Sequence, residues 1–198
     1  MTRFSVLALT VLACAACSRD ASQAANQSES QSTQATAGCI AGGGGNLQAQ
    51  LRGALVADLD WRNADMQCEG GLRPDGHGLR VTIAGPLPVA AGAAPRHLRF
   101  IFGIDPRDIA SGVAQALPTN VTVILEGEQQ LFATQGDGHC AVELLERTPL
   151  EPTPKGRKQD RVHARGYCLD PATTLAGDAR LLVPTFEFTG VANTELDP

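Results

Sequence analysis

The stretch LRGALVADLDWR, from Leu51 to Arg62, decides the fold class. Small or apolar residues fall on every second position from Leu51 to Trp61, and charged residues occupy positions between them. A period of two is typical of a strand with one buried face. Leucines spaced four apart, with Asn46 as a cap, also fit a helix over 46–57, so that alternative stays open. We favour the strand because the period-two set is longer and ends on an aromatic residue.

Further short segments carry β-branched or aromatic residues and are bounded by Gly, Pro, Asn or Asp, as strands usually are. They lie at 64–69, 79–84, 97–104, 121–126, 129–134, 139–147, 161–168 and 180–189. Asp105 and Pro106 are suited to begin one short helix over Arg107–Ala116. About nine strands without alternating helices predict an all-β fold, an antiparallel β-sandwich or barrel with at most one or two short helices.

Residues 1–17 have the organisation of a secretory signal. Arg3 precedes an apolar run from Phe4 to Ala13, and Ala15 and Ala16 come before Cys17. The run is too short to span a bilayer as a helix, which needs roughly 20 residues, so we expect the segment to be cleaved. The small residues before the cysteine resemble the lipobox of bacterial lipoproteins, which implies that Cys17 is acylated and becomes the new N-terminus.

Two alternatives to Cys17 stay open. Cys14 also has suitable residues before it, and an ordinary secretory signal would be cut just before Ser18. Cys17 is favoured because its lipidation removes Cys14 with the signal and leaves an even set of cysteines. The resemblance implies a diacylglycerol and an N-acyl chain, a stable anchor, and Ser18 after the cysteine resembles outer-membrane sorting. We expect a lipid-anchored protein at the outer membrane, facing the periplasm.

Residues 18–45 are rich in Ser, Gln, Ala and Gly, and almost no large apolar side chain occurs between Ser18 and Gly38. Such a segment cannot bury enough surface to offset its chain entropy, so we expect a disordered linker. The four glycines Gly42 to Gly45 extend it to the edge of the domain. Residues 46–198 are then expected to form a single β domain.

The four remaining cysteines, Cys39, Cys68, Cys140 and Cys168, predict two disulfides. Four cysteines allow three pairings, and we favour the two local ones, Cys39 with Cys68 and Cys140 with Cys168, because each closes a loop of similar length. A zinc site is the alternative, but structural zinc sites usually contain closely spaced cysteine pairs that this sequence lacks.

One run of the sequence predicts a basic surface. If Val162, Ala164 and neighbouring alternate residues of their strand face inward, the cationic residues between them share the outer face. The proposed ligand-binding residues are Lys155, Arg157, Lys158, Arg161, His163 and Arg165. Guanidinium groups bind phosphate and carboxylate through paired hydrogen bonds, so an anionic glycan or lipid headgroup is the expected ligand. A solvated outer face beside an exposed loop is the alternative.

A repeated phrase offers a weaker metal hypothesis. Asp75-Gly76-His77 and Asp137-Gly138-His139 each place a carboxylate beside an imidazole on a turn. If the turns meet in space, Asp75, His77, Asp137 and His139 could bind a transition metal. Hairpin turns with a chance histidine explain the phrase equally, and we expect no metal and no cofactor.

The remaining observations exclude classes of function. The chain carries 16 Lys and Arg residues against 21 Asp and Glu, a formal net charge of −5, which argues against nucleic acid as a partner. Ser111 does not lie in a G-x-S-x-G motif. Carboxylates such as Glu143 and Glu146 give no sign of a catalytic pair, so we expect no enzyme activity.

Three stretches of the globular part suggest a family: CEGGLRPDGHG (Cys68–Gly78), LPTNVTVILEG (Leu117–Gly127) and FATQGDGHC (Phe132–Cys140). In these stretches the chain resembles small uncharacterised lipoproteins of Gram-negative bacteria. It implies class and location and assigns no functional residue. The sequence thus predicts a lipid-anchored envelope protein that binds or supports another envelope protein. The alternatives are a binding module for an anionic glycan or lipid headgroup, and a metal-binding or hydrolytic envelope enzyme.

Overall fold

The computed structural model describes residues 38–105, 116–128, 130–151, 158–175 and 177–193. Strands dominate this part of the chain, and every strand pair is antiparallel, which confirms the all-β prediction. The strands are β1 (Asn46–Gly53), β2 (Ala57–Arg62), β3 (Gln67–Leu72), β4 (Leu79–Leu87), β5 (Arg96–Ile104), β6 (Leu117–Glu126), β7 (Gln130–Ala133), β8 (Cys140–Pro149), β9 (Gln159–Cys168), β10 (Ala172–Thr174), β11 (Arg180–Leu182) and β12 (Phe186–Asn193). A single 3-10 turn, η1 (Asn63–Asp65), is the only helical element among the described residues.

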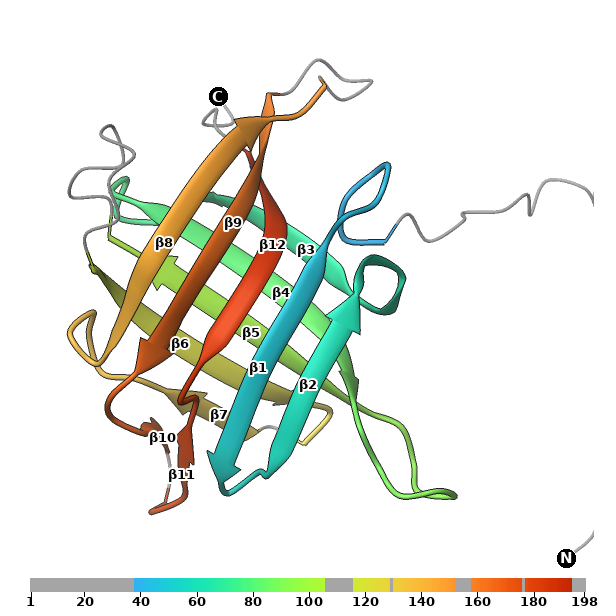
Figure 1. Cartoon of the computed structure of the whole chain (residues 1–198). Helices are drawn as coiled ribbons and strands as arrows, with labels where there is room; N and C mark the ends of the chain where they lie inside the picture. The colour runs from blue at the N-terminus through green and yellow to red at the C-terminus, as the bar shows by residue number, and fades with distance from the viewer. Residues whose placement is uncertain (1–37, 106–115, 129, 152–157, 176, 194–198) are drawn as a thin grey trace, which may run out of the picture. The chain divides into compact units, whose positions relative to one another are not determined.

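The strands form two layers (Figure 1). The front layer is made of β8, β9, β12, β1 and β2, and the back layer of β3, β4, β5, β6 and β7 crosses behind it. The short strands β10 and β11 connect the two layers between β7 and β1. At another point β6 leaves β7 and pairs with β8, through Leu117–Thr119 and Cys140–Val142. The result is a sandwich-like arrangement whose layers are joined by hydrogen bonds.

The expected strand 51–61 is in fact a hairpin. β1 ends at Gly53 and β2 begins at Ala57, so the helix alternative over 46–57 is wrong as well. Gly53 has a φ of 109°, and a Cβ there would lie 2.5 Å from the carbonyl oxygen of Arg180. The chain can reverse here because glycine adopts positive φ without steric cost. Odd-numbered residues such as Leu51 and Leu59 face inward on both strands, so the period of two runs through the turn.

The other strand predictions are right in type and differ in extent. The segment expected over 180–189 divides into β11 and β12, and β10 was not anticipated. The segment expected from Ala64 begins with the 3-10 turn, and its strand starts at Gln67. The short helix expected over Arg107–Ala116 falls almost wholly outside the described residues.

The core lies between the two layers and rests on a small group of aromatic side chains. Phe102 of β5 contacts Phe186 and Phe188 of β12, with ring centroids 4.9 and 4.6 Å apart. Trp61 of β2 meets Phe100 edge-on at 5.9 Å, and its indole nitrogen donates a hydrogen bond to the carbonyl oxygen of Pro86. Each ring faces inward because it occupies a buried position in its strand's alternation.

The packed region begins upstream of Asn46. Ile40 is 2% exposed and belongs to the core, and Cys39 is buried beside it. The side-chain oxygen of Asn63 accepts hydrogen bonds from the backbone N–H groups of Ile40 and Gly45, at 2.9 and 3.0 Å, and its amide nitrogen donates to the carbonyl oxygen of Ile40. Residues 39–45, expected to end the linker, therefore fold against the β2–β3 connection.

Candidate binding groove

The structure confirms both local disulfides. Cys39 is bonded to Cys68 of β3, and Cys140 to Cys168. The second pair joins directly opposed residues of β8 and β9. The first encloses β1, β2 and η1 in its loop, because Cys39 precedes those elements and Cys68 follows them. These four cysteines are thus all bonded in disulfides.

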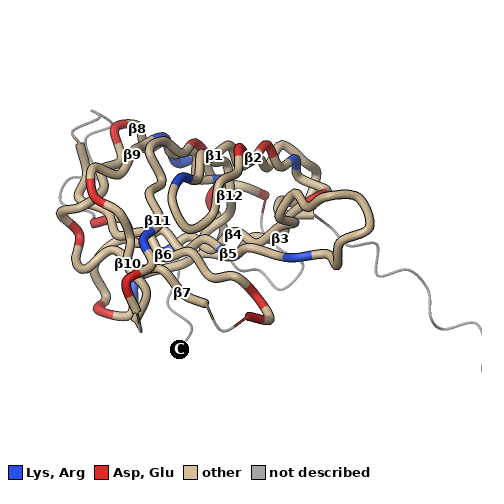
Figure 2. Tube along the Cα trace, turned by 90° about the horizontal axis from the view of Figure 1, so that it is seen from below, with Lys and Arg blue, Asp and Glu red and all other residues tan. Residues whose placement is uncertain are grey.

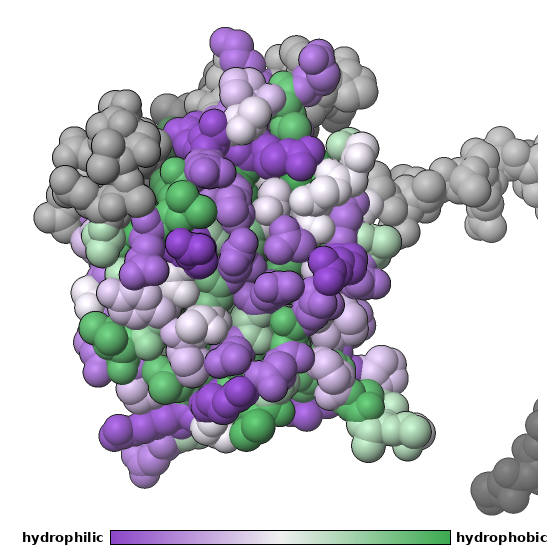
Figure 3. Space-filling view, in the orientation of Figure 1, coloured by the Kyte–Doolittle hydropathy of each residue, from purple (hydrophilic) through white to green (hydrophobic). Residues whose placement is uncertain are grey.

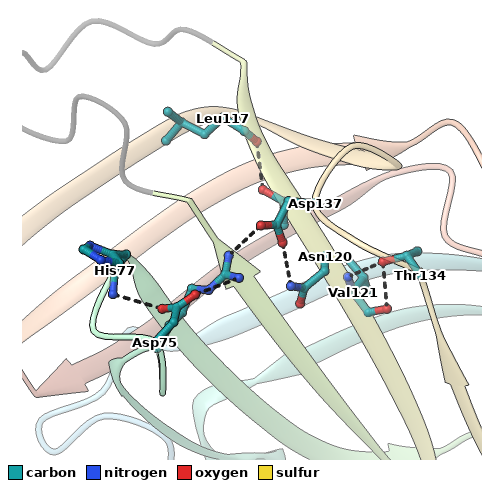
Figure 4. Close-up of polar contacts among 9 residues, drawn as sticks. Asp75, His77, Leu117, Asn120, Val121, Thr134 and Asp137 are labelled. Carbon is teal, nitrogen blue, oxygen red and sulfur yellow. Dashed lines mark hydrogen bonds and ion pairs between the residues drawn. The ribbon is translucent and has the colours of Figure 1, made fainter.

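The two Asp-Gly-His turns do approach each other, around an arginine. Asp75 and Asp137 point toward one another from different turns (Figure 4). The Arg73 guanidinium lies between them, with one nitrogen 3.3 Å from Asp75 and another 3.1 Å from Asp137. Asn120 donates a further hydrogen bond of 2.7 Å to Asp137. The chain itself therefore places one positive charge between these two carboxylates.

The histidines of the same turns point elsewhere. His77 is exposed, and its backbone N–H donates to the Asp75 side chain. The Nδ1 atom of His139 lies 2.9 Å from Asp170. Within the ranges that the structure describes, no group of three or more His, Cys, Asp or Glu residues could hold a metal ion.

Strand β9 places Arg161, His163 and Arg165 on the outer face of the front layer, as predicted, because the residues between them are buried. The neighbours are acidic, however. His163 lies 3.3 Å from Glu146 and 3.0 Å from Glu187. Figure 2 shows basic and acidic residues interspersed along this layer. The sequence-predicted patch is thus embedded in a surface of mixed charge.

Two members of the predicted patch, Lys158 and Arg161, lie near the start of β9. Arg161 reaches the N-terminal segment, where its guanidinium donates to the carbonyl oxygen of Gly43 at 3.4 Å. Lys158 is exposed just before β9. Lys155 and Arg157 lie outside the described residues.

A groove of about 380 Å³ crosses the outer face of the front layer. Hydrophilic residues gather over this face in the space-filling view (Figure 3). β2, β1, β12, β9 and β8 all contribute to its lining, which consists of Gln48, Ala49, Gln50, Asp58, Leu59, Asp60, Glu143, Arg165, Gly166, Tyr167, Thr185, Phe186 and Glu187. The volume falls within the range of ligand pockets.

Strand register aligns the polar side chains of the groove in a row. Asp60 of β2 lies opposite Gln48 of β1, Gln48 opposite Glu187 of β12, and Glu187 opposite Arg165 of β9. Directly opposed residues in an antiparallel sheet have Cβ atoms about 5 Å apart. The row therefore offers an acid, an amide, an acid and a guanidinium in succession across four strands.

An irregularity in β8 adds a further carboxylate. Val142 pairs with Gly166 and Leu144 with Arg165, so Glu143 has no partner on β9 and forms a β-bulge. Val142 is buried and Leu145 packs against the core, which leaves Glu143 and Leu144 together on the outer face. Bulges commonly redirect a side chain next to a functional site. Here the bulge directs Glu143 to the groove beside Arg165 and Tyr167.

Some groove residues are already paired and others are not. Asp58 pairs with Arg52 at 2.7 Å, Asp60 with Arg62 at 2.8 Å, and Glu187 with His163. Among the described residues, the side chains of Gln50, Glu143, Arg165 and Tyr167 make no hydrogen bond or ion pair. These four groups are available to a ligand.

The arrangement is suited to hydrogen bonding. Four carboxylates accept, two carboxamides accept and donate, and one guanidinium donates. A carboxyl group that acts as a general acid needs an apolar environment, whereas the Asp58 and Asp60 side chains are 70% and 52% exposed. Neither of these two carboxyl groups therefore has the surroundings that a general acid needs.

Sequence reasoning missed most of the groove. The polar positions of β1 and β2 were visible in the alternation, but nothing in the sequence indicated that β12 and β9 lie beside them. In the described part of the chain, no helix has the length and apolar character needed to cross a membrane. Comparison with protein-family models, curated proteins and solved structures yields no match.

Proposed function

We propose that the chain is a lipoprotein of the bacterial cell envelope, anchored through acyl groups on Cys17, whose β domain binds another envelope component without chemical turnover. The observation that carries the proposal is the groove across five strands of the front layer, where charged and amide side chains lie beside apolar ones. The two disulfides support the location, because disulfides persist in oxidising compartments such as the periplasm. The lipobox resemblance at Cys17 supports the anchor.

The anionic-ligand alternative has weaker support. Its cationic strand face is flanked by Glu146 and Glu187, which lie within ion-pair distance of His163. A phosphate or sulfate that approached His163 would have to displace or neutralise these carboxylates. The groove beside it holds more carboxylates than cations, which also disfavours a polyanion.

Metabolic labelling with a clickable fatty acid tests the anchor. The chain expressed in a Gram-negative host is expected to carry the label and to fractionate with membranes. Cys17→Ala should abolish both properties, and Cys14→Ala, the matched control, should preserve them. A label that survives Cys17→Ala and disappears with Cys14→Ala would move the anchor to Cys14. An unlabelled wild-type chain released after cleavage before Ser18 would refute the lipoprotein proposal.

Photo-crosslinking tests the binding role in the envelope. A photoreactive amino acid at Gln50, inside the groove, is expected to capture an envelope component. The control places the photoreactive amino acid at position 80 instead, where Arg80 is exposed on the outer face of β4, and this variant should capture less. Equal capture at both positions, or none at Gln50, would argue against the groove as the binding surface.

A further inference from the structure

The groove has a composition that selects among ligand classes. Its polar side chains include acceptors and donors, and Tyr167 adds an apolar ring with a phenol. Four carboxylates and the single guanidinium of Arg165 line the groove, and Arg52 and Arg62 pair with two of those carboxylates, so the lining holds no excess of positive charge for an acidic ligand. A ligand rich in hydroxyl groups, neutral or carrying amino groups, matches both the hydrogen-bonding capacity and the charge.

The position of the groove disfavours an extended peptide. Peptides that bind sheets commonly add a strand at a free edge, where unpaired backbone groups supply the hydrogen bonds. Over the central part of this groove, β1, β12 and β9 each pair with a strand on either side, whereas β2 at one end of the groove pairs with β1 alone among the described strands. Only side chains are offered to a ligand there, so the ligand must be recognised through its own dense polar groups.

We infer that the groove binds an oligosaccharide that carries hydroxyl groups, with or without amino groups, and no acidic groups. The inference deepens the proposed function and rests on it. Gln48, Glu187 and Arg165 form the central row under the sugar chain, and Asp60 continues that row at the β2 edge. Glu143, directed outward by the bulge, and Tyr167 lie at the β8 side of the groove. The ligand runs across the strands because the groove does.

Titration calorimetry on the full, oxidised chain tests the inference. The probes are cellotetraose, maltotetraose, chitotetraose and its de-acetylated form, with a heparin tetrasaccharide and a lysine-rich decapeptide as contrasting ligands. At least one of the first four is expected to saturate with a Kd of about 1 mM or tighter, which corresponds to about −4 kcal/mol. The heparin fragment is expected to bind more weakly or not at all.

Two variants locate the site, each with a matched control. Arg165→Ala and Glu143→Gln remove unpaired groove groups and are expected to weaken binding about tenfold, because hydrogen bonds to charged groups are the strong ones. Arg80→Ala and Glu69→Gln change exposed residues of the back layer and are expected to leave the Kd within about twofold. Backbone amide shifts of the wild-type chain, which require no variant, are expected to change on β1, β9 and β12.

Several results would overturn the inference. They are saturation by none of the four saccharides, tighter binding of the heparin fragment, unchanged affinity in both groove variants, or amide shifts confined to the back layer. Binding of the lysine-rich peptide alone would assign the groove to a basic protein segment. Because the anchor and the crosslinks are measured separately, these results could overturn the sugar ligand while the proposed envelope function still stands.

Discussion

Replacing Asn63 by alanine is expected to loosen the N-terminal segment of the domain. The Asn63 side chain makes three hydrogen bonds to residues 40–45, accepting from the N–H groups of Ile40 and Gly45 and donating to the carbonyl oxygen of Ile40. Gly45 also approaches it closely, since a Cβ on Gly45 would lie 2.6 Å from the Asn63 side-chain oxygen. Alanine removes all three bonds and leaves the backbone groups without those partners.

The expected loss follows from these contacts. Each hydrogen bond contributes about 1 kcal/mol net, so the free energy of unfolding should fall by about 3 kcal/mol in Asn63→Ala. Asn63→Asp keeps an acceptor for the two N–H groups and loses the donor, so its loss should be about 1–2 kcal/mol. Asn46, on β1, makes no side-chain hydrogen bond among the described residues, and Asn46→Ala should cost less than about 0.5 kcal/mol.

Urea unfolding followed by circular dichroism measures these values. The Cys39–Cys68 disulfide holds the same segment as the Asn63 side chain. When both cysteines are replaced by alanine, we therefore expect Asn63→Ala to lower the free energy of unfolding by at least ~1 kcal/mol less than it does in the oxidised chain. The disulfide itself should contribute about 3.5 kcal/mol by the loop-entropy estimate. A loss in Asn63→Ala below about 1 kcal/mol, or strict additivity with the cysteine replacement, would refute the reasoning.

Three further outcomes are expected. Gly70→Ala should lower the free energy of unfolding in urea by about 2 kcal/mol or more, because the new Cβ would lie 2.4 Å from a carbonyl oxygen of β12. Gly71→Ala is the control and should be nearly neutral, because no atom lies nearer than 3.8 Å to a Cβ at that position. Asp137→Asn should lower the free energy of unfolding by about 1–2 kcal/mol, because Asp137 contacts both Arg73 and Asn120. Asp75→Asn, which changes a half-exposed carboxylate, should change that free energy by less than about 0.5 kcal/mol. Equal losses in the two variants would contradict the network described around Arg73. Trp61→Phe should lower the thermal midpoint, because the indole N–H bond of 2.9 Å to the end of β4 disappears; an unchanged midpoint would show that this bond contributes nothing net.

The fold class could be predicted because β1 and β2 keep the same alternation on both sides of their turn. The same regularity concealed the hairpin, since Gly53 sits in phase with the apolar residues and gives no separate signal. β10 was missed because three residues carry too little alternation to be recognised. The boundary at Asn46 was placed too late because Ile40 is an isolated apolar residue beside a glycine run, and its burial depends on contacts with distant strands.

The local disulfide pairing was predictable from spacing, whereas the groove was not. Its central row joins Asp60, Gln48, Glu187 and Arg165, which are brought together only by the order of the strands in the front layer. The cationic alternation of β9 was correctly placed on one face. Its acidic surroundings come from β8 and β12, and strand neighbours of that kind are set by long-range packing that a local pattern does not encode.

The Cys39–Cys68 bond also determines how the domain would respond to tension. A pull applied through residues that precede Gly38 reaches Cys39 first and passes across the sulfur–sulfur bond into β3. Strands β1 and β2 lie inside that covalent loop and cannot be drawn out along the pulling direction. A separation of 29 residues corresponds to about 100 Å of extended chain that stays locked while the bond is intact. In an anchored protein, the two strands that carry one side of the groove would thus keep their length under load and become extensible only on reduction.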